Sequence, residues 1–232
     1  FMLSKKQLSK YIKKQVLRST LIEKRFPKRL EHRKKVNMIR YSIDNPPVID
    51  QCIDLGFATF KGKYDLNIIA CRNMKERPGT FQDTIHVVYH DGSKWIEYVF
   101  PCTTHAGQHY LLNPSRSSGV AILKHNHQYR SCFKIGMRSS GYECLVPCKE
   151  ILVWRDGNTD DVIDYGGPDH DSAGIQIHRA NSSNTSLKIG RYSAGCVVLQ
   201  TGFNDFMDLC HKQVQNRKGS TFTLTILKGI HL

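Results

Sequence analysis

The alternation of apolar and polar residues from Phe57 onward is the feature that most limits how this chain can fold. Side chains of a β-strand point alternately to opposite faces, so a period of two predicts strands with one buried face. Strands are expected at residues 57–60, 66–72, 84–90, 95–100, 120–123, 142–146, 151–155, 175–178, 196–199 and 221–227. Asp91-Gly92 is typical of a tight hairpin turn between two of them. The sequence therefore predicts a domain that is mainly β.

Helices are expected at the start of the chain and once within the β-rich region. The apolar residues Phe206, Met207, Leu209 and Cys210 predict a helix over residues 203–215. Asn45-Pro46-Pro47 opens a short helix that Gly56 closes. Nearer the N-terminus, a capping box at residues 4–7 precedes an amphipathic helix that ends before Pro27 and carries Leu8, Tyr11, Ile12, Val16 and Leu17 on one face. Residues 28–40 can continue as helix, so residues 1–45 are interpreted as an α-helical arm.

The positive charge of the chain is concentrated in this arm. The net charge is +14, but residues 1–40 hold 14 Lys or Arg against only Glu23 and Glu31, while the other 192 residues hold 20 basic and 18 acidic side chains. A basic amphipathic helix is suited to an anionic partner such as nucleic acid or a phosphate-bearing polymer, or to another protein subunit. A merely solvated arm is the third interpretation, which its apolar stripe disfavours.

The remaining composition excludes several classes of protein. No stretch approaches the roughly 18 apolar residues of a membrane-spanning helix, and we expect any export signal to be absent or already removed. Eight dispersed cysteines in a chain of 232 residues do not form the disulfide framework of a small secreted domain. The pairs Cys144 with Cys148 and His105 with His109 lack the second half of a zinc site, and the polar turn that begins at Asp156 lacks the glycine and glutamate of a calcium loop. We therefore expect no metal and no cofactor.

The residues that can take part in a reaction concentrate between positions 171 and 200, where the sequence reads DSAGIQIHRANSSNTSLKIGRYSAGCVVLQ. His178 ends a strand-like run of residues, and a polar loop follows it. Ser193-Ala194-Gly195 then precedes Cys196 and an apolar strand. A cysteine is a useful nucleophile only as thiolate, so it needs a nearby imidazole or cation to remove its proton. The small residues before Cys196 leave room for a substrate and offer backbone N–H groups to an oxyanion. His178 and Cys196 are therefore the candidate reacting pair.

This arrangement of residues resembles the catalytic domain of the L,D-transpeptidases, and in particular the divergent phage-type members of that family. In that family a histidine on one strand is followed, after a loop, by Ser-x-Gly-Cys and a hydrophobic strand, and His178 and residues 193–196 match these positions. The order of His before Cys differs from that of papain-like peptidases, and sortases separate the two residues further. The likeness covers roughly residues 60–230, with familiar segments at residues 64–69, Arg72, residues 81–83, 103–104 and 153–156. It implies an L,D-transpeptidase-like β-sandwich or barrel with one or two packed helices over residues 46–232.

The resemblance also implies a mechanism and a set of site residues. Cys196 would attack a peptidoglycan stem peptide to give a thioacyl-enzyme and release D-alanine, with His178 as base and then acid. Ser193 and Gly195 would support the catalytic pair, and the N–H of Cys196, together with that of Gly195, would hold the oxyanion. Two residues depart from the family pattern: Ala194 stands where His or Ser is usual, and Val198 where Arg is common. Binding of a substrate carboxylate is therefore assigned to Arg179 or Arg191, with Tyr192 and Ala194 lining the substrate.

Two alternatives stay open beside this cell-wall enzyme. The first is a non-enzymatic virion or assembly protein that keeps the fold and binds a partner through its arm, which the departures at Ala194 and Val198 favour. The second is a cysteine peptidase or amidase that uses the same pair on another amide. The sequence leaves the choice between transpeptidation and hydrolysis open, as it does the location of the protein, whether virion-associated or periplasmic.

Overall fold

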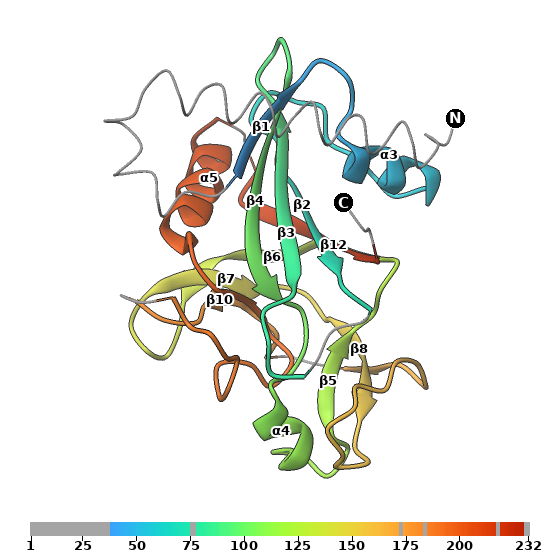
Figure 1. The fold of residues 1–232 in the computed structure, drawn as a ribbon. Helices are drawn as coiled ribbons and strands as arrows, with labels where there is room; N and C mark the ends of the chain where they lie inside the picture. The colour runs from blue at the N-terminus through green and yellow to red at the C-terminus, as the bar shows by residue number, and fades with distance from the viewer. Residues whose placement is uncertain (1–37, 75–77, 172–173, 183–184, 217–218, 230–232) are drawn as a thin grey trace. The chain divides into compact units, whose positions relative to one another are not determined.

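The computed structural model describes residues 38–74, 78–171, 174–182, 185–216 and 219–229, and these residues are mainly β (Figure 1). The expected amphipathic helix at residues 8–26 and most of the basic arm lie outside the described residues. The short helix opened by the two prolines is present as α3 (Pro47–Asp54), and its backbone cap at Leu55 precedes Gly56. Among the described helices, none has both the length and the apolar character needed to cross a membrane.

Within the described residues, eight strands close into a barrel. Going round the ring, the strands are β4 (Trp95–Thr103), β11 (Val197–Leu199), β10 (Ile177–Arg179), β7 (Glu143–Pro147), β6 (His127–Met137), β12 (Thr221–Lys228), β2 (Asn67–Arg72) and β3 (Asp83–His90), which pairs back to β4. A further strand, β1 (Met38–Ser42), pairs antiparallel with β4 outside the ring. Closure leaves the ring without an unpaired edge, so the expected mainly β fold is confirmed as a barrel.

A smaller sheet of three strands accompanies the barrel. It consists of β5 (Val120–Leu123), β8 (Leu152–Asp156) and β9 (His170–Asp171), all antiparallel. A short helix, α4 (Gln108–Leu112), lies between β4 and β5 in the chain. In Figure 1 β5 and β8 lie side by side below the long strands of the barrel, next to α4.

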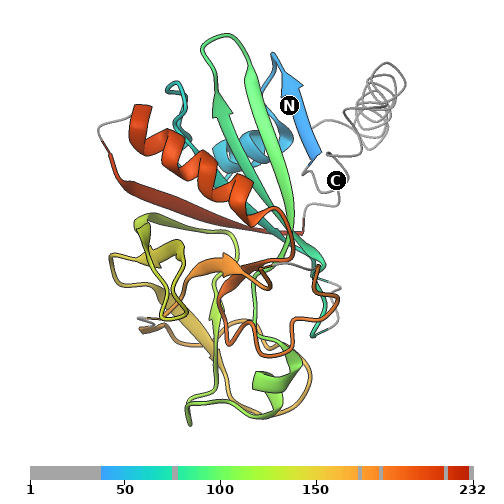
Figure 2. The same cartoon turned by 90° about the vertical axis from the view of Figure 1, so that its left-hand side faces the viewer.

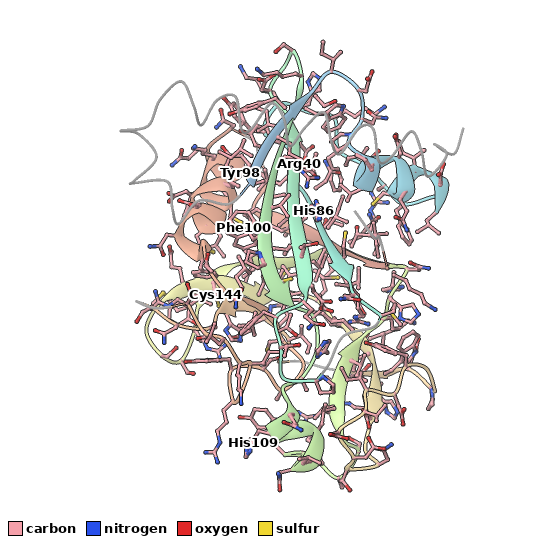
Figure 3. All side chains as sticks on the ribbon, viewed as in Figure 1. Arg40, His86, Tyr98, Phe100, His109 and Cys144 are labelled. Carbon is pink, nitrogen blue, oxygen red and sulfur yellow. The ribbon has the colours of Figure 1, made fainter. Side chains whose placement is uncertain are left out.

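One wall of the barrel buries apolar residues on both of its faces. On one face Phe100 contacts Phe206 of α5 (Phe203–Asn216) with ring centroids 5.9 Å apart, so α5 packs against the main core (Figure 2). On the other face Val88 joins α3 in a second apolar cluster. Figure 3 labels Phe100 on β4 and His86 on β3, whose side chains belong to these two opposite faces. Such burial on both faces gives near-continuous apolar strands rather than a clean alternation.

The predicted elements agree with the structure at most positions. The strand at residues 120–123 has the expected bounds, and the strands expected at 66–72, 84–90, 95–100, 142–146, 151–155, 175–178, 196–199 and 221–227 appear with shifts at their ends. The helix at 203–215 is confirmed as α5. The Asp91-Gly92 turn is also confirmed: Asp91 N donates to Lys94 O at 3.0 Å, and the Asp91 carboxylate accepts the N–H groups of Ser93 and Lys94.

Two expected elements are wrong. Residues 38–40 form part of β1 rather than a helix, because pairing with β4 satisfies their backbone and Ile39 packs on the main core. Residues 57–60 are not a strand, since side-chain amides bind their backbone. Gln128 Oε1 accepts from Ala58 N at 3.1 Å, and Asn67 Oδ1 accepts from Phe60 N at 2.7 Å. The strands β1, β6 and β9 and the helix α4 were not expected.

Candidate active site

His178 lies on β10, and Cys196 directly precedes β11, the neighbouring parallel strand. Ile177 lies opposite Val197 and His178 opposite Val198 in the β10–β11 ladder, and Val197 N donates to Gln176 O at 3.0 Å. Extending this register by one residue sets Cys196 beside Gln176. Because side chains alternate along a strand, His178 and its ladder partner Val198 point to the same face, and Cys196, two residues before Val198, is expected on that side. Ile177 and Val197 point the other way, into the core.

His178 is fixed in one orientation and one tautomer. Its Nδ1 lies 2.9 Å from Arg179 O, and a carbonyl oxygen can only accept, so Nδ1 carries the hydrogen. Nε2 is then the basic nitrogen, and it is buried without a hydrogen-bond partner among the described residues. Burial lowers the pKa of His178 to about 4, with the Arg179 carbonyl opposing the change and the charge of Arg138 adding to it. The ring is therefore a neutral base with its lone pair uncommitted.

Cys196 differs from most cysteines of the chain in its exposure. All eight cysteines are free, six of them are buried, Cys148 is exposed, and Cys196 is half-buried. The Cys196 thiol donates to Gly174 O at 3.7 Å, and its sulfur accepts from Gln176 N at 3.5 Å. Burial raises the pKa of this thiol, while the Gln176 N–H and the guanidinium of Arg138 act in the opposite direction.

In the resting structure Cys196 is thus a neutral thiol and His178 a neutral imidazole. No hydrogen bond joins them in the described structure, because Nε2 of His178 has no partner and the thiol is directed to Gly174 O. Catalytic hydrogen bonds are often long in the absence of substrate and shorten in the reactive complex. Turning the thiol hydrogen from Gly174 O toward His178 is the change that would prepare Cys196 for attack.

The turn before Cys196 is braced by Ser193. Its Oγ donates to Cys196 O at 2.8 Å and accepts from Gly195 N at 3.1 Å, while Ser193 O accepts from Gly107 N at 3.0 Å. Ser193 is fully buried, so its hydroxyl holds the backbone of Cys196 and is not exposed at the surface. The structure gives Ser193 a positioning role.

The backbone donors expected for an oxyanion are only partly available. Gly195 N–H, expected to bind an oxyanion, donates to Ser193 Oγ at 3.1 Å in this structure and is not free. Cys196 N–H has no hydrogen-bond partner within the described part of the chain. It is also the amide of the nucleophile itself, and this donor is therefore the one that remains for a developing negative charge.

The residues expected to bind substrate differ in their exposure and in the contacts that hold them. Ala194, Arg191 and Tyr192 are exposed on the segment that leads to Cys196, and Tyr192 N is tied to Ile189 O at 2.9 Å. Arg179 directly follows His178, and its guanidinium stacks on the ring of Tyr142 at 4.1 Å from the centroid. A stacked guanidinium keeps its charge and is held in place, so Arg179 is the better ordered of the two candidate arginines.

Sequence reasoning missed Arg138 and Gln176. Arg138 Nη1 donates to Gln176 Oε1 at 2.5 Å, and the same guanidinium lowers the pKa of the Cys196 thiol against the larger effect of burial. Arg138 lies 38 residues before Gln176 in the chain, in the turn after β6, a strand that was itself not expected. No local pattern signals it, because only the closure of the barrel brings it to the site.

Several of the segments that carry the family likeness meet in a buried polar network. Arg72 Nε donates to Thr104 Oγ1 at 2.8 Å and Arg72 Nη1 donates to Leu123 O at 2.8 Å, while Asp83 Oδ2 accepts both the N–H and the hydroxyl of Thr104. The Arg72 guanidinium also lies over the ring of Tyr165. Every one of these groups is a structural donor or acceptor, so the network fixes β2, β3 and β5 relative to one another.

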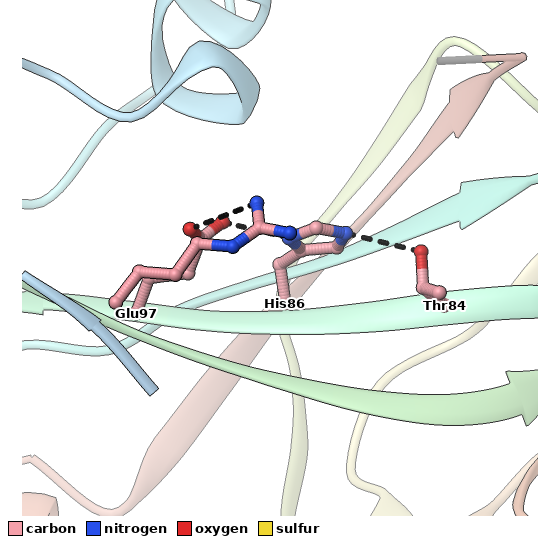
Figure 4. A network of polar contacts seen from close by, with 4 residues as sticks. Thr84, His86 and Glu97 are labelled. Carbon is pink, nitrogen blue, oxygen red and sulfur yellow. Dashed lines mark hydrogen bonds and ion pairs between the residues drawn. The ribbon is translucent and has the colours of Figure 1, made fainter. Parts of the chain in front are cut away.

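A second buried network lies on β3 and β4 (Figure 4). His86 Nδ1 lies 2.7 Å from Glu97 Oε1, and His86 Nε2 lies 3.0 Å from Thr84 Oγ1. Arg40 of β1 completes it at 3.5 Å from Glu97. These contacts join the four residues to one another, which is the pattern of a structural network. Among the described residues, no group of three or more His, Cys, Asp or Glu side chains could hold a metal ion.

Comparison with known proteins gave no matching family model, no matching curated protein and no matching solved structure.

Proposed function

We propose that this protein is a cysteine acyltransferase or hydrolase of the L,D-transpeptidase type that acts on peptidoglycan stem peptides. The observation that carries the proposal is the parallel pairing of β10, which holds His178, with β11, which Cys196 directly precedes. The free Nε2 of His178 supports a role as base, and the half-exposure of Cys196 supports a role as nucleophile. The closed barrel with few helices is compatible with the L,D-transpeptidase-like domain that the sequence motif favours.

The reaction follows from the chemistry of the pair. His178 Nε2 takes the thiol proton, and the sulfur of Cys196 forms a bond to the carbonyl carbon of the amide. The N–H of Cys196 stabilises the resulting oxyanion. The carbon–nitrogen bond then breaks, the leaving amine takes the proton from His178, and D-alanine departs. An amine or a water molecule finally attacks the thioester and restores the thiol.

Incubation with purified muropeptides tests the proposal. Mass spectrometry distinguishes release of D-alanine from new cross-links and from plain hydrolysis, and so also decides between transfer and trimming. We expect Cys196→Ala to abolish all three products and His178→Ala to reduce them by about a hundredfold or more, the usual value of a general base. Cys148→Ala is the matched control, since it removes the exposed thiol and leaves the pair untouched.

A second readout uses a carbapenem, because enzymes of the resembled family tend to be acylated by this class of β-lactam. A mass increase present in the intact protein and in Cys148→Ala, but lost in Cys196→Ala, would support the proposal. A protein that gives neither a carbapenem adduct nor any muropeptide product would instead be the non-enzymatic assembly protein. Cleavage of other amides alone would indicate the peptidase or amidase alternative.

A further inference from the structure

Arg138 occupies a fixed position in the turn that joins β6 to β7. Arg138 N donates to Tyr142 O at 2.9 Å, and Gly141 N donates to Arg138 O at 2.9 Å, so both backbone groups of the residue are bound. Gly136 pairs with Cys144 and Met137 with Glu143 just before this turn. In Figure 1 the neighbouring strand β7 lies beside β10, which carries His178, and Ile177 pairs with Leu145.

Gln176 connects the guanidinium of Arg138 to the sulfur of Cys196. Its side-chain oxygen accepts from Arg138 Nη1 at 2.5 Å, and its backbone N–H donates to Cys196 Sγ at 3.5 Å. One residue therefore holds both the cation and the nucleophile. Since a guanidinium has five N–H donors, binding to Gln176 leaves others for a thiolate at Cys196, and Arg138 is among the groups that lower the pKa of this thiol.

The charge of Arg138 acts on the two members of the pair in opposite directions. Burial raises the pKa of Cys196, and the positive charge and hydrogen bond of Arg138 counter it by favouring the thiolate. Burial lowers the pKa of His178, and the same positive charge lowers it further by disfavouring the imidazolium. Cys144, on β7, is the other titratable described group in electrostatic contact with Cys196, and burial keeps its thiol neutral by raising its pKa to about 11.

A stable thiolate–imidazolium pair is therefore not what this site favours. The anion has its counter-ion in Arg138, and an imidazolium formed at His178 would face the same cation. An imidazolium that loses its proton this easily is a strong acid toward a leaving amine. The thiol proton accordingly passes through Nε2 of His178 and does not remain there.

We propose that Arg138 is a catalytic residue of this site, held by Gln176 against Cys196 as the counter-ion of the thiolate, while His178 only carries the proton from the thiol to the leaving amine. The inference rests on the proposed function, because it assigns a role within that reaction.

The pH dependence of Cys196 alkylation by iodoacetamide tests this role without any peptidoglycan. The full chain with Cys148→Ala serves as the reference, since the six other cysteines are buried and Cys196 is then the accessible thiol. We expect Arg138→Ala to move the midpoint of the alkylation rate upward by about one pH unit or more, as loss of an adjacent opposite charge does. Arg138→Lys should recover part of the shift, and Gln176→Ala should give a smaller upward shift because Arg138 remains but is no longer held.

Lys134→Ala is the matched control, because this exposed lysine of β6 lies close to the same turn in sequence and pairs with Val146, away from the sulfur. Should Arg138→Ala fail to fold, Arg138→Gln keeps much of the side chain without its charge and must give the same upward shift. An unchanged midpoint in a folded Arg138→Ala or Arg138→Gln protein overturns the inference, whether or not D-alanine is released from muropeptides. A shifted midpoint without muropeptide activity would instead retain the thiolate pairing and refute the proposed function.

Discussion

The carbonyl oxygen of Ala121 lies where a side chain at position 195 would begin. A Cβ built on Gly195 would be 2.4 Å from Ala121 O, and Gly195 has φ +123°, a conformation that residues with a side chain rarely adopt. Two features therefore require glycine at this position: the close approach of β5 and the backbone conformation of the turn. The contact connects the small three-stranded sheet to the segment that presents Cys196.

Replacing this glycine should displace the nucleophile. We expect Gly195→Ala to lower the free energy of unfolding by about 3 kcal/mol or more, because the strained φ and the collision with Ala121 both act on the folded state. Denaturant unfolding measures the loss, and the alkylation rate of Cys196 reports whether the sulfur has moved. Gly219→Ala is the control, since a Cβ there meets nothing within 4 Å. Equal stability of the Gly195→Ala variant and the intact protein would contradict the close contact.

Ser193 should matter for the shape of the turn and not for chemistry. Ser193→Ala removes a donor to Cys196 O and leaves Gly195 N–H buried without its acceptor, so we expect a loss of about 1 to 3 kcal/mol in the free energy of unfolding. D-alanine release should be reduced but still measurable, unlike in Cys196→Ala. Thermal unfolding and the muropeptide assay together check this, with exposed Ser117→Ala as the reference substitution. A complete loss of activity in a stable Ser193→Ala protein would assign the hydroxyl a direct role.

The candidate site was predictable to the extent that it is local. His178 and Cys196 each lie at or beside a short apolar strand, and the 18-residue separation between them is spanned by one loop, so sequence alone could pair them. The parallel pairing that brings the segments of His178 and Cys196 together depends on β10 and β11 meeting in the barrel. That arrangement is a long-range property that neither strand encodes by itself.

The longest strand of the barrel shows why other parts were not predictable. In β6 the exposed Arg130 and Lys134 interrupt the apolar run, and Ser131 adopts φ +49°. The pairing with β12 shifts register between Phe222 and Leu224, which breaks the period of two. Because β6 was not expected, the turn after it and Arg138 were not connected to the site.

Residues 57–60 were predicted to form a strand and do not form one. Their pattern is that of a strand, yet the amides of Asn67 and Gln128 replace a neighbouring strand as their hydrogen-bond partners. These amides come from positions 7 and 70 residues away, so the competing partners cannot be recognised from the segment itself. Local pattern predicts extended backbone here, but long-range side-chain contacts determine what that backbone binds.

The low pKa of His178 makes stability depend on pH in a defined direction. In the unfolded chain a histidine binds a proton near pH 6.5, whereas in the folded protein His178 does so near pH 4. Between these values the unfolded state binds more protons, so the contribution of His178 to stability rises with pH and is complete above about 6.5. The size implied by such a difference is about 3 kcal/mol.

His178→Asn should therefore flatten the increase in stability between pH 4.5 and pH 7. Denaturant unfolding at both values measures the slope, and the difference between variant and intact protein isolates His178. His105 and His125, whose pKa values are also lowered by burial, keep part of the slope in the variant. His211→Asn, at an exposed ion pair with Glu143, should leave the slope nearly unchanged. A slope that is identical with and without His178 would mean that its ring is not buried as a neutral base.

Glu97 should give a second dependence on pH, at lower values and from a different part of the barrel. Burial raises the pKa of this carboxyl, but the hydrogen bond and charge of His86 and the charge of Arg40 outweigh it, so the pKa lies below its ordinary value of 4.5. A carboxyl with a depressed pKa stabilises the fold above the pKa of the unfolded chain, and the contribution is lost as pH falls through the folded value.

We expect Glu97→Gln to cost about 3 kcal/mol at pH 7, because it leaves Arg40 and the buried His86 without their anion. As the pH falls through the lowered pKa of Glu97, the carboxyl of the intact protein is itself protonated, so the two proteins should converge in stability. Denaturant unfolding from pH 7 to pH 3 follows this convergence. Glu143→Gln, which removes an exposed partner of His211, should cost less than about 1 kcal/mol over the same range. If Glu97→Gln were as stable as the intact protein at pH 7, the anion would not be holding β1 to the barrel wall through Arg40, and pairing of the two backbones would have to suffice.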